Sequence, residues 1–118
     1  MPETQSQSAS VLAILQDAKS PVTVFTLSWC SYCHAVKNLL HTLGVPCHTV
    51  ELDSGVYLDT QLHRRMRTEL QQLSGSQTLP QVFVGVDSVG GYTETQAALR
   101  TGRLQELLSR HGIDISAP

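Results

Sequence analysis

Two cysteines stand where an apolar strand turns into a helix, and this arrangement constrains the chain more than any other feature. The run Val22–Leu27 is apolar and β-branched, Cys30 and Cys33 follow it, and apolar residues then recur at 36, 39, 40 and 43. That recurrence is the spacing of one helix face. Unpaired N–H groups and the helix dipole favour a negative charge at a helix start, and a thiolate is such a charge. The pattern predicts Cys30 as an exposed attacking thiolate and Cys33, one turn inward, as the resolving thiol.

Size and composition indicate one soluble domain in a reducing compartment. The chain has 118 residues, 41% of them hydrophobic, and a formal net charge of -2, which gives no general attraction to nucleic acid or to anionic membranes. Three cysteines, only two of them closely spaced, do not make a disulfide framework. We expect a flexible segment at 1–9, a folded domain at 10–113 and a tail at 114–118. The expected location is the cytoplasm, or an organelle if a transit peptide has been removed.

The order of predicted elements gives a fold class. We expect a short helix capped by Ser10, a strand at 22–27, a helix at 31–43, a strand at 46–52, a long helix at 57–73 and a strand at 81–86. A turn at 87–88 should lead to a short strand at 89–90 and then to a helical region divided at Gly102. The helical crossover makes the first two strands parallel, and the near-hairpin makes the last two antiparallel. The prediction is an α/β fold, with a four-stranded mixed sheet and helices on both faces.

Pro80 is the second feature that bears on function. Because X–Pro bonds lose only about 0.5–1 kcal/mol on going cis, a cis Leu79–Pro80 bond is compatible with this position. A cis proline facing the cysteines would leave the backbone of Leu79 free to pair with a peptide-like substrate. The other interpretation of Pro80 is an ordinary first residue of an edge strand.

Other uses of the cysteines have less support in the sequence. A zinc site normally needs four ligands, and His41 and His48 have no partner at metal-binding spacing. The string from Cys30 to His34 matches a c-type haem attachment pattern, but the preceding strand and the element order argue against haem. Cys47, in the second predicted strand, is expected to be a buried small hydrophobe.

Three linked motifs resemble the dithiol glutaredoxins, which have a thioredoxin fold. The first is the strand–helix junction with Cys30-Ser31-Tyr32-Cys33, the second is Gly75-x-x-Thr78-Leu79-Pro80-x-Val82-Phe83-Val84, and the third is Gly90-Gly91-x-Thr93-Glu94-Thr95. The resemblance implies glutathione bound beside the cysteines. It implies that Cys30 attacks glutathione mixed disulfides of proteins, and that Cys30 and Cys33 together reduce protein disulfides. The implied partners are glutathione and glutathionylated or disulfide-containing proteins. The implied glutathione contacts are Tyr32, Arg67, Thr78, Leu79, Pro80, Gly91, Tyr92, Thr93 and Glu94.

The chain also departs from this family. Leu27 stands where these proteins usually have a lysine that stabilises the thiolate and holds glutathione, so Arg67 or the neighbouring Arg64 and Arg65 would have to bind the carboxylate. Ser31 replaces the usual proline and resembles members that dimerise around a [2Fe–2S] cluster. There Cys30 of each subunit and two glutathione thiols would be the ligands. The expected state is a monomer, with a cluster-bridged homodimer as the alternative. A third alternative is a reductase that does not use glutathione.

Overall fold

A computed structural model describes residues 10–115. The expected flexible segment at 1–9 and the last residues of the expected tail, 116–118, lie outside the described part. The described elements are α2 (Val11–Asp17), β1 (Val22–Thr26), α3 (Ser31–Thr42), β2 (Cys47–Glu51), the 3-10 helix η1 (Gly55–Leu58), α4 (Thr60–Ser74), β3 (Gln81–Val84), β4 (Asp87–Gly90), α5 (Tyr92–Thr101) and α6 (Arg103–Ser109). Among these helices, none is long and apolar enough to cross a membrane.

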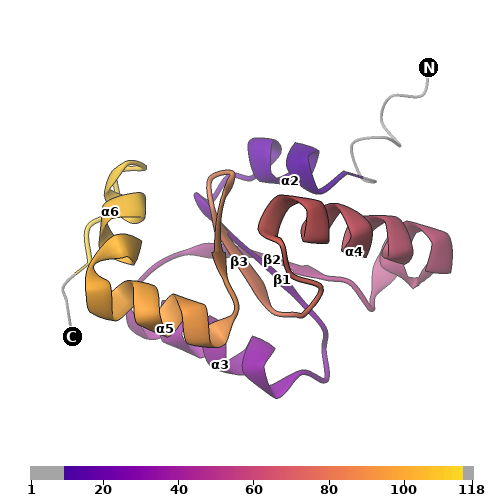
Figure 1. Cartoon of the computed structure of the whole chain (residues 1–118), viewed down its shortest axis with the longest axis horizontal. Helices are drawn as coiled ribbons and strands as arrows, with labels where there is room; N and C mark the ends of the chain where they lie inside the picture. The colour runs from indigo at the N-terminus through magenta and orange to yellow at the C-terminus, as the bar shows by residue number, and fades with distance from the viewer. Residues whose placement is uncertain (1–9, 116–118) are drawn as a thin grey trace.

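The four strands form one mixed sheet in the order β2-β1-β3-β4. β1 is parallel to β2, whereas β3 is antiparallel to both β1 and β4. Helices cover both faces, α2 and α4 on one side and α3, α5 and α6 on the other (Figure 1). The predicted α/β fold is therefore confirmed.

The two central strands place alternate side chains in two separate cores. Val22 and Val24 of β1 pack with α3, α5 and α6 on one face. Phe25 of β1 and Phe83 of β3 meet edge to face on the other, with ring centroids 5.8 Å apart, beneath α2 and α4. Because β1 is buried on both faces, its position is fixed, and it delivers the loop before Cys30 to one edge of the sheet.

Two local predictions were wrong. The long helix does not begin at 57: Gly55–Leu58 form η1, and the Asp59 carboxylate then caps α4 by accepting from the backbone N–H groups of Gln61 and Leu62. The hairpin turn is at residues 85–86 and not at 87–88, so β3 ends at Val84. Gly85 has φ +60, which suits the first central position of a tight hairpin turn.

The other helix boundaries follow the sequence closely. The Ser10 hydroxyl caps α2 by accepting from the N–H of Ala13, as predicted. Gly102 separates α5 from α6, as predicted. Its φ of +88 is a left-handed backbone conformation, which ends α5 and which glycine adopts without strain.

Candidate active site

Cys30 is the N-cap of α3, as the sequence predicts. Its sulfur accepts a hydrogen bond from the backbone N–H of Cys33 at 3.3 Å. The Cys30 carbonyl accepts from the N–H of His34 at 3.2 Å, which closes the first turn of the helix. The side chain of Cys30 is half-buried, so its sulfur stands at the end of the helix with access to the surface.

Cys33 lies beneath Cys30 and is fully buried. Burial, together with the hydrogen bond to the Cys30 side chain, raises the pKa of the Cys33 thiol to about 12. Both cysteines are free thiols in the structure. The pair is thus asymmetric: Cys30 is accessible, and Cys33 is a protonated thiol held below it.

The segment around Pro80 lies against Cys30. The Leu79–Pro80 peptide bond is cis, and the Cys30 thiol points at the Leu79 carbonyl with a sulfur–oxygen distance of 3.8 Å. Thr78 is exposed and Leu79 is half-buried, so their backbone borders the surface beside the thiol. The buried Gln81 side chain donates to the Thr78 carbonyl at 3.0 Å and holds this segment from below, which sequence reasoning missed.

The glycine pair places the start of α5 next to Pro80. A Cβ built on Gly91 would lie 3.4 Å from the Pro80 carbonyl oxygen, so the two segments touch. The Glu94 carboxylate accepts from the Gly91 N–H at 2.9 Å and completes a helix cap. Gly90 has φ +118, and a Cβ there would lie 2.6 Å from the Cβ of Glu94. Thr93 and Glu94, in the first turn of α5, are both exposed.

Aromatic side chains connect the cysteine motif with α5. The rings of Tyr32 and Tyr92 have centroids 5.9 Å apart. Tyr32 is 62% exposed and Trp29 is 75% exposed, so large apolar surface lies open beside Cys30. Trp29 and Tyr32 therefore face solvent and not the protein core.

Arg67 reaches the far end of the Thr78–Pro80 segment. Its guanidinium donates to the Gln77 carbonyl at 3.0 Å and lies 3.3 Å from the imidazole of His63. These side chains line an open pocket of about 630 Å³. Arg64 lines the same pocket and Arg65 does not, so among the three arginines Arg67 is the one that contacts the residue before Thr78.

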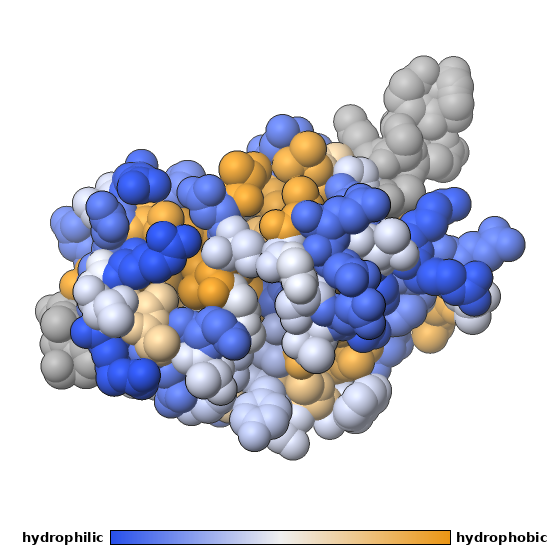
Figure 2. All heavy atoms as spheres, in the orientation of Figure 1, coloured by the Kyte–Doolittle hydropathy of each residue, from blue (hydrophilic) through white to orange (hydrophobic). Residues whose placement is uncertain are grey.

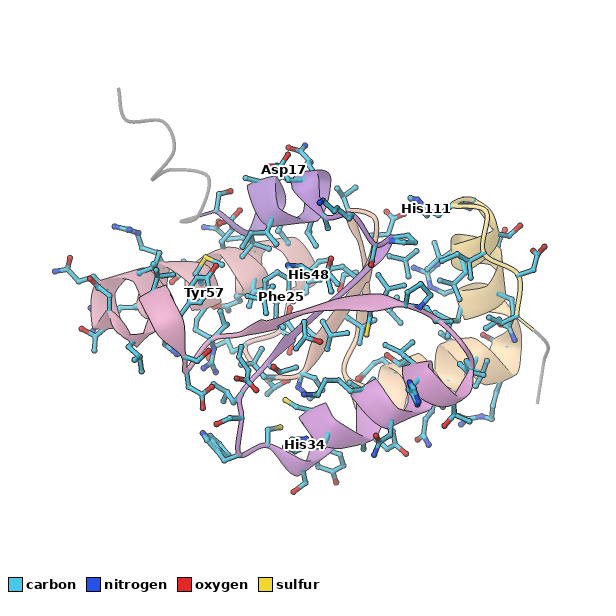
Figure 3. The ribbon with its side chains drawn as sticks, turned by 180° about the vertical axis from the view of Figure 1, so that it is seen from behind. Asp17, Phe25, His34, His48, Tyr57 and His111 are labelled. Carbon is cyan, nitrogen blue, oxygen red and sulfur yellow. The ribbon has the colours of Figure 1, made fainter. Side chains whose placement is uncertain are left out.

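Leu27 and Ser28 shape the loop that leads to Cys30. Leu27 packs against the core beneath α2 and α4, so an apolar side chain and not a cation stands three residues before Cys30. The Asp53 carboxylate accepts from the Ser28 N–H at 3.1 Å and from its hydroxyl at 2.6 Å, and these bonds hold the pKa of Asp53 below its usual value. His34, labelled on the first turn of α3 in Figure 3, contacts the Ser28 carbonyl at 2.9 Å. Sequence patterns do not reveal the contact between Ser28 and Asp53, because the two residues are 25 positions apart in the chain.

Cys47 takes no part in this site. It is half-buried at the start of β2 and packs against the core beneath α3 and α5. Burial raises the pKa of its thiol. This agrees with the expected role of a small hydrophobe.

The arrangement of Cys30, Cys33 and a cis proline in one fold can now be compared with known proteins. The glutaredoxin family model matches residues 22–89, which is more than half of the chain. The chain belongs to the glutaredoxin family. It is 38% identical over 99 residues to monothiol glutaredoxin-S10 of Oryza sativa, covering 84% of this chain but only 58% of that relative. It is 36% identical over 89 residues to a glutaredoxin of Pseudomonas aeruginosa, covering 75% of this chain and 96% of that one.

The fold of the chain is also similar to that of a glutaredoxin of known structure. The buckwheat glutaredoxin–glutathione complex is 28% identical and superposes with a TM-score of 0.73, covering 94% of this chain and 90% of the buckwheat chain. Membership of the family supports a glutathione-linked redox role. The thioredoxin fold expected from the sequence is confirmed.

Proposed function

We propose that this glutaredoxin is a glutathione-dependent thiol–disulfide oxidoreductase that reduces protein–glutathione mixed disulfides. The observation that carries the proposal is the juxtaposition of one accessible sulfur, Cys30, with the backbone of the cis Leu79–Pro80 segment. A peptide-like thiol could pair with that backbone while its sulfur meets Cys30. Glutathione is such a peptide, and the buckwheat relative is described in complex with it.

The reaction divides into two exchange steps. The Cys30 thiolate attacks the glutathione sulfur of a mixed disulfide, a new sulfur–sulfur bond forms, and the protein leaves as its thiolate. A second glutathione thiolate then attacks the Cys30–glutathione disulfide, which gives oxidised glutathione and restores the Cys30 thiolate. In the net reaction one glutathione thiol and the mixed disulfide give the protein thiol and oxidised glutathione, and the proton lost by glutathione is balanced by the proton that the leaving protein thiolate takes up.

Each part of the proposed glutathione site has a physical basis. The Thr78–Pro80 backbone would pair with the cysteinyl residue, and Tyr32 and Tyr92 would flank it. Gly91, Thr93 and Glu94 at the start of α5 would hold the γ-glutamyl end, since a helix start suits a carboxylate. Arg67 would bind the glycyl carboxylate, because guanidinium–carboxylate pairs are strong and directional.

Cys33 extends the proposal to protein disulfides. In that route Cys33 attacks the mixed disulfide formed at Cys30, after transferring its proton. In the reduced protein burial raises the pKa of the Cys33 thiol to about 12, so this route first requires removal of a tightly held proton. The glutathione route, which needs Cys30 alone, is therefore expected to dominate.

Coupled turnover tests the proposal. A glutathionylated peptide is supplied with glutathione, glutathione reductase and NADPH, and NADPH loss is followed. Cys30→Ser should abolish turnover, Cys33→Ser should keep deglutathionylation but lose reduction of a protein disulfide, and Cys47→Ser should match the wild type. A folded wild-type protein that turns over protein disulfides but not the glutathionylated peptide would favour the reductase that does not use glutathione.

Binding of a [2Fe–2S] cluster in a homodimer stays a second proposal, in which Cys30 is the protein ligand. The buried Cys33 is poorly placed to ligate, and among residues 10–115 no three His, Cys, Asp or Glu side chains gather as a metal site. The remaining thiolates would have to come from glutathione and from the second subunit. Anaerobic reconstitution with iron, sulfide and glutathione should give a coloured dimer that Cys30→Ser abolishes. A colourless monomer would refute cluster binding.

The remaining assignments follow from the same proposal. The partners would be glutathione and glutathionylated or disulfide-containing proteins, and the protein would act as a monomer when no cluster is bound. A cytoplasmic location stays a prediction.

A further inference from the structure

Both ring nitrogens of His63 on α4 have partners. Nδ1 lies 2.6 Å from the Leu52 carbonyl oxygen, and Nε2 lies 3.3 Å from a terminal nitrogen of Arg67 one turn later. The side chain is half-buried on the wall of the pocket that contains Arg67. Sequence reasoning did not select His63 for any role.

The two contacts fix which nitrogen of His63 carries the proton. A carbonyl oxygen can only accept, so Nδ1 of His63 must donate to Leu52. A guanidinium can only donate, so Nε2 must accept from Arg67 with its lone pair. The contact with Arg67 therefore exists only while the imidazole is neutral.

Arg67 is held from two sides by this arrangement. One terminal nitrogen donates to His63 and the other donates to the Gln77 carbonyl at 3.0 Å. A guanidinium has five N–H donors, so at least three remain for a ligand in the pocket. Gln77 directly precedes Thr78, so this orientation keeps the free donors at the end of the proposed glutathione groove.

We propose that His63 is a positioning residue that holds Arg67 in place for the glycyl carboxylate. The inference rests on the proposed function and specifies how one of its ligand contacts is maintained. Loss of the Nε2 acceptor would leave one side of the Arg67 guanidinium without a partner, so the guanidinium would be held less firmly and carboxylate binding would weaken.

Other charged groups lie around His63. Asp53, two residues after β2, interacts electrostatically with it. Arg64, also on α4, lines the same pocket. Tyr57 on η1 lines the same pocket, and Figure 3 labels it beside α4.

Two substitutions separate positioning from simple packing. His63→Leu removes the acceptor, whereas His63→Gln keeps an amide oxygen that can accept from Arg67 but does not titrate. His63→Leu should raise the KM for a glutathionylated peptide about three- to tenfold, the scale of one ordinary hydrogen bond, because the contact positions Arg67 and does not itself touch the ligand. Its kcat should stay within about twofold, because Cys30 is untouched, and His63→Gln should keep KM near the wild-type value.

A matched control gives the second readout. His41→Gln, at an exposed position in the last turn of α3, should leave the KM for the glutathionylated peptide unchanged.

A truncated substrate tests the link to the glycyl carboxylate. A peptide disulfide-bonded to γ-glutamylcysteine lacks the glycine, so wild type and His63→Leu should have the same KM for it. An equal defect with both substrates, in a variant that keeps its melting temperature, would overturn the positioning role, as would an unchanged KM for the glutathionylated peptide. Absence of wild-type turnover with the glutathionylated peptide would instead overturn the proposed function, and this inference with it.

Discussion

The Glu69 carboxylate of α4 caps the start of α2, and its removal should destabilise the fold measurably. It accepts from the N–H of Val11 at 2.8 Å and from that of Leu12 at 2.9 Å, and the Ser10 hydroxyl donates to it at 3.2 Å. These N–H groups have no partner within their own helix, because they belong to its first turn. Glu69→Ala would leave both of them without a protein acceptor.

The size of the effect follows from the type and exposure of these bonds. Loss of a helix cap costs about 0.5–2 kcal/mol, and a hydrogen bond to a charged group contributes about 1.5–3 kcal/mol. The carboxylate site is only part-buried, so we expect about 2 kcal/mol for Glu69→Ala. Val11 and Leu15 are buried against the sheet and contribute about 1.5–3 kcal/mol each, so α2 should stay docked. The expected fall in melting temperature is about 8 °C, at roughly 4 °C per kcal/mol for a domain of this size.

Thermal and urea unfolding of matched variants checks this expectation. Glu69→Gln keeps one carbonyl acceptor and should lose about half as much stability. Glu106→Ala is the control, because its ion pair with Arg110 is 3.8 Å long and both side chains are more than 60% exposed, so the cost should be below about 0.5 kcal/mol. Turnover of folded Glu69→Ala should be normal, since α2 and α3 lie on opposite faces of the sheet (Figure 1). Equal losses in the Glu69 and Glu106 variants would refute the reasoning.

Three further predictions concern the active site. In the native reduced protein at about pH 8, iodoacetamide should modify Cys30 and spare Cys33, whose pKa is raised to about 12 by burial; equal labelling, read by peptide mass spectrometry, would contradict that burial. Gly90→Ala should lower both stability and turnover, because φ is +118 and the new Cβ would lie 2.6 Å from Glu94; wild-type melting and kinetics would show that the turn relaxes freely. Asp53→Asn should lower the melting temperature at neutral pH. The lowered pKa of Asp53 means that its contribution is present above the usual carboxyl pKa of 3.8 and is lost in more acidic solution, so the difference from wild type should shrink there.

Local sequence signals predicted much of the fold because they act within a few residues. Ser10 begins α2, Gly102 divides the last helical region and Cys30 begins α3, as expected. The start of α4 was misplaced, because the helical spacing of apolar residues runs back through η1 and hides the cap at Asp59. The hairpin turn was misplaced because Gly85 stands within an apolar run, between Val84 and Val86, that has the composition of a strand.

Contacts between distant segments account for what the sequence could not predict. The pairing of Ser28 with Asp53 spans 25 residues, and Glu69 reaches α2 across 58. His63 and Arg67 are only four residues apart in the sequence. Their contact orients the guanidinium only because the Gln77 carbonyl accepts from its other terminal nitrogen. No periodicity or motif marks such pairs.

The surface of the molecule is consistent with a site confined to one edge. The side of α4 that faces solvent is hydrophilic in Figure 2, where its residues form a largely blue surface. Near Cys30, by contrast, Trp29 and Tyr32 expose aromatic rings. This aromatic border is the surface that a disulfide-linked protein would meet on approach to the sulfur.

The identity of the trapped intermediate tests the central claim most directly. Cys33→Ser is mixed with a limiting amount of a glutathionylated peptide, quenched with acid, and analysed by intact-protein and peptide mass spectrometry. If Cys30 attacks the glutathione sulfur, the protein carries glutathione on Cys30 and the free peptide thiol is released in equal amount. A protein that carries the peptide in place of glutathione, or an adduct on another residue, would contradict the proposed glutathione site and the roles given to the residues around it.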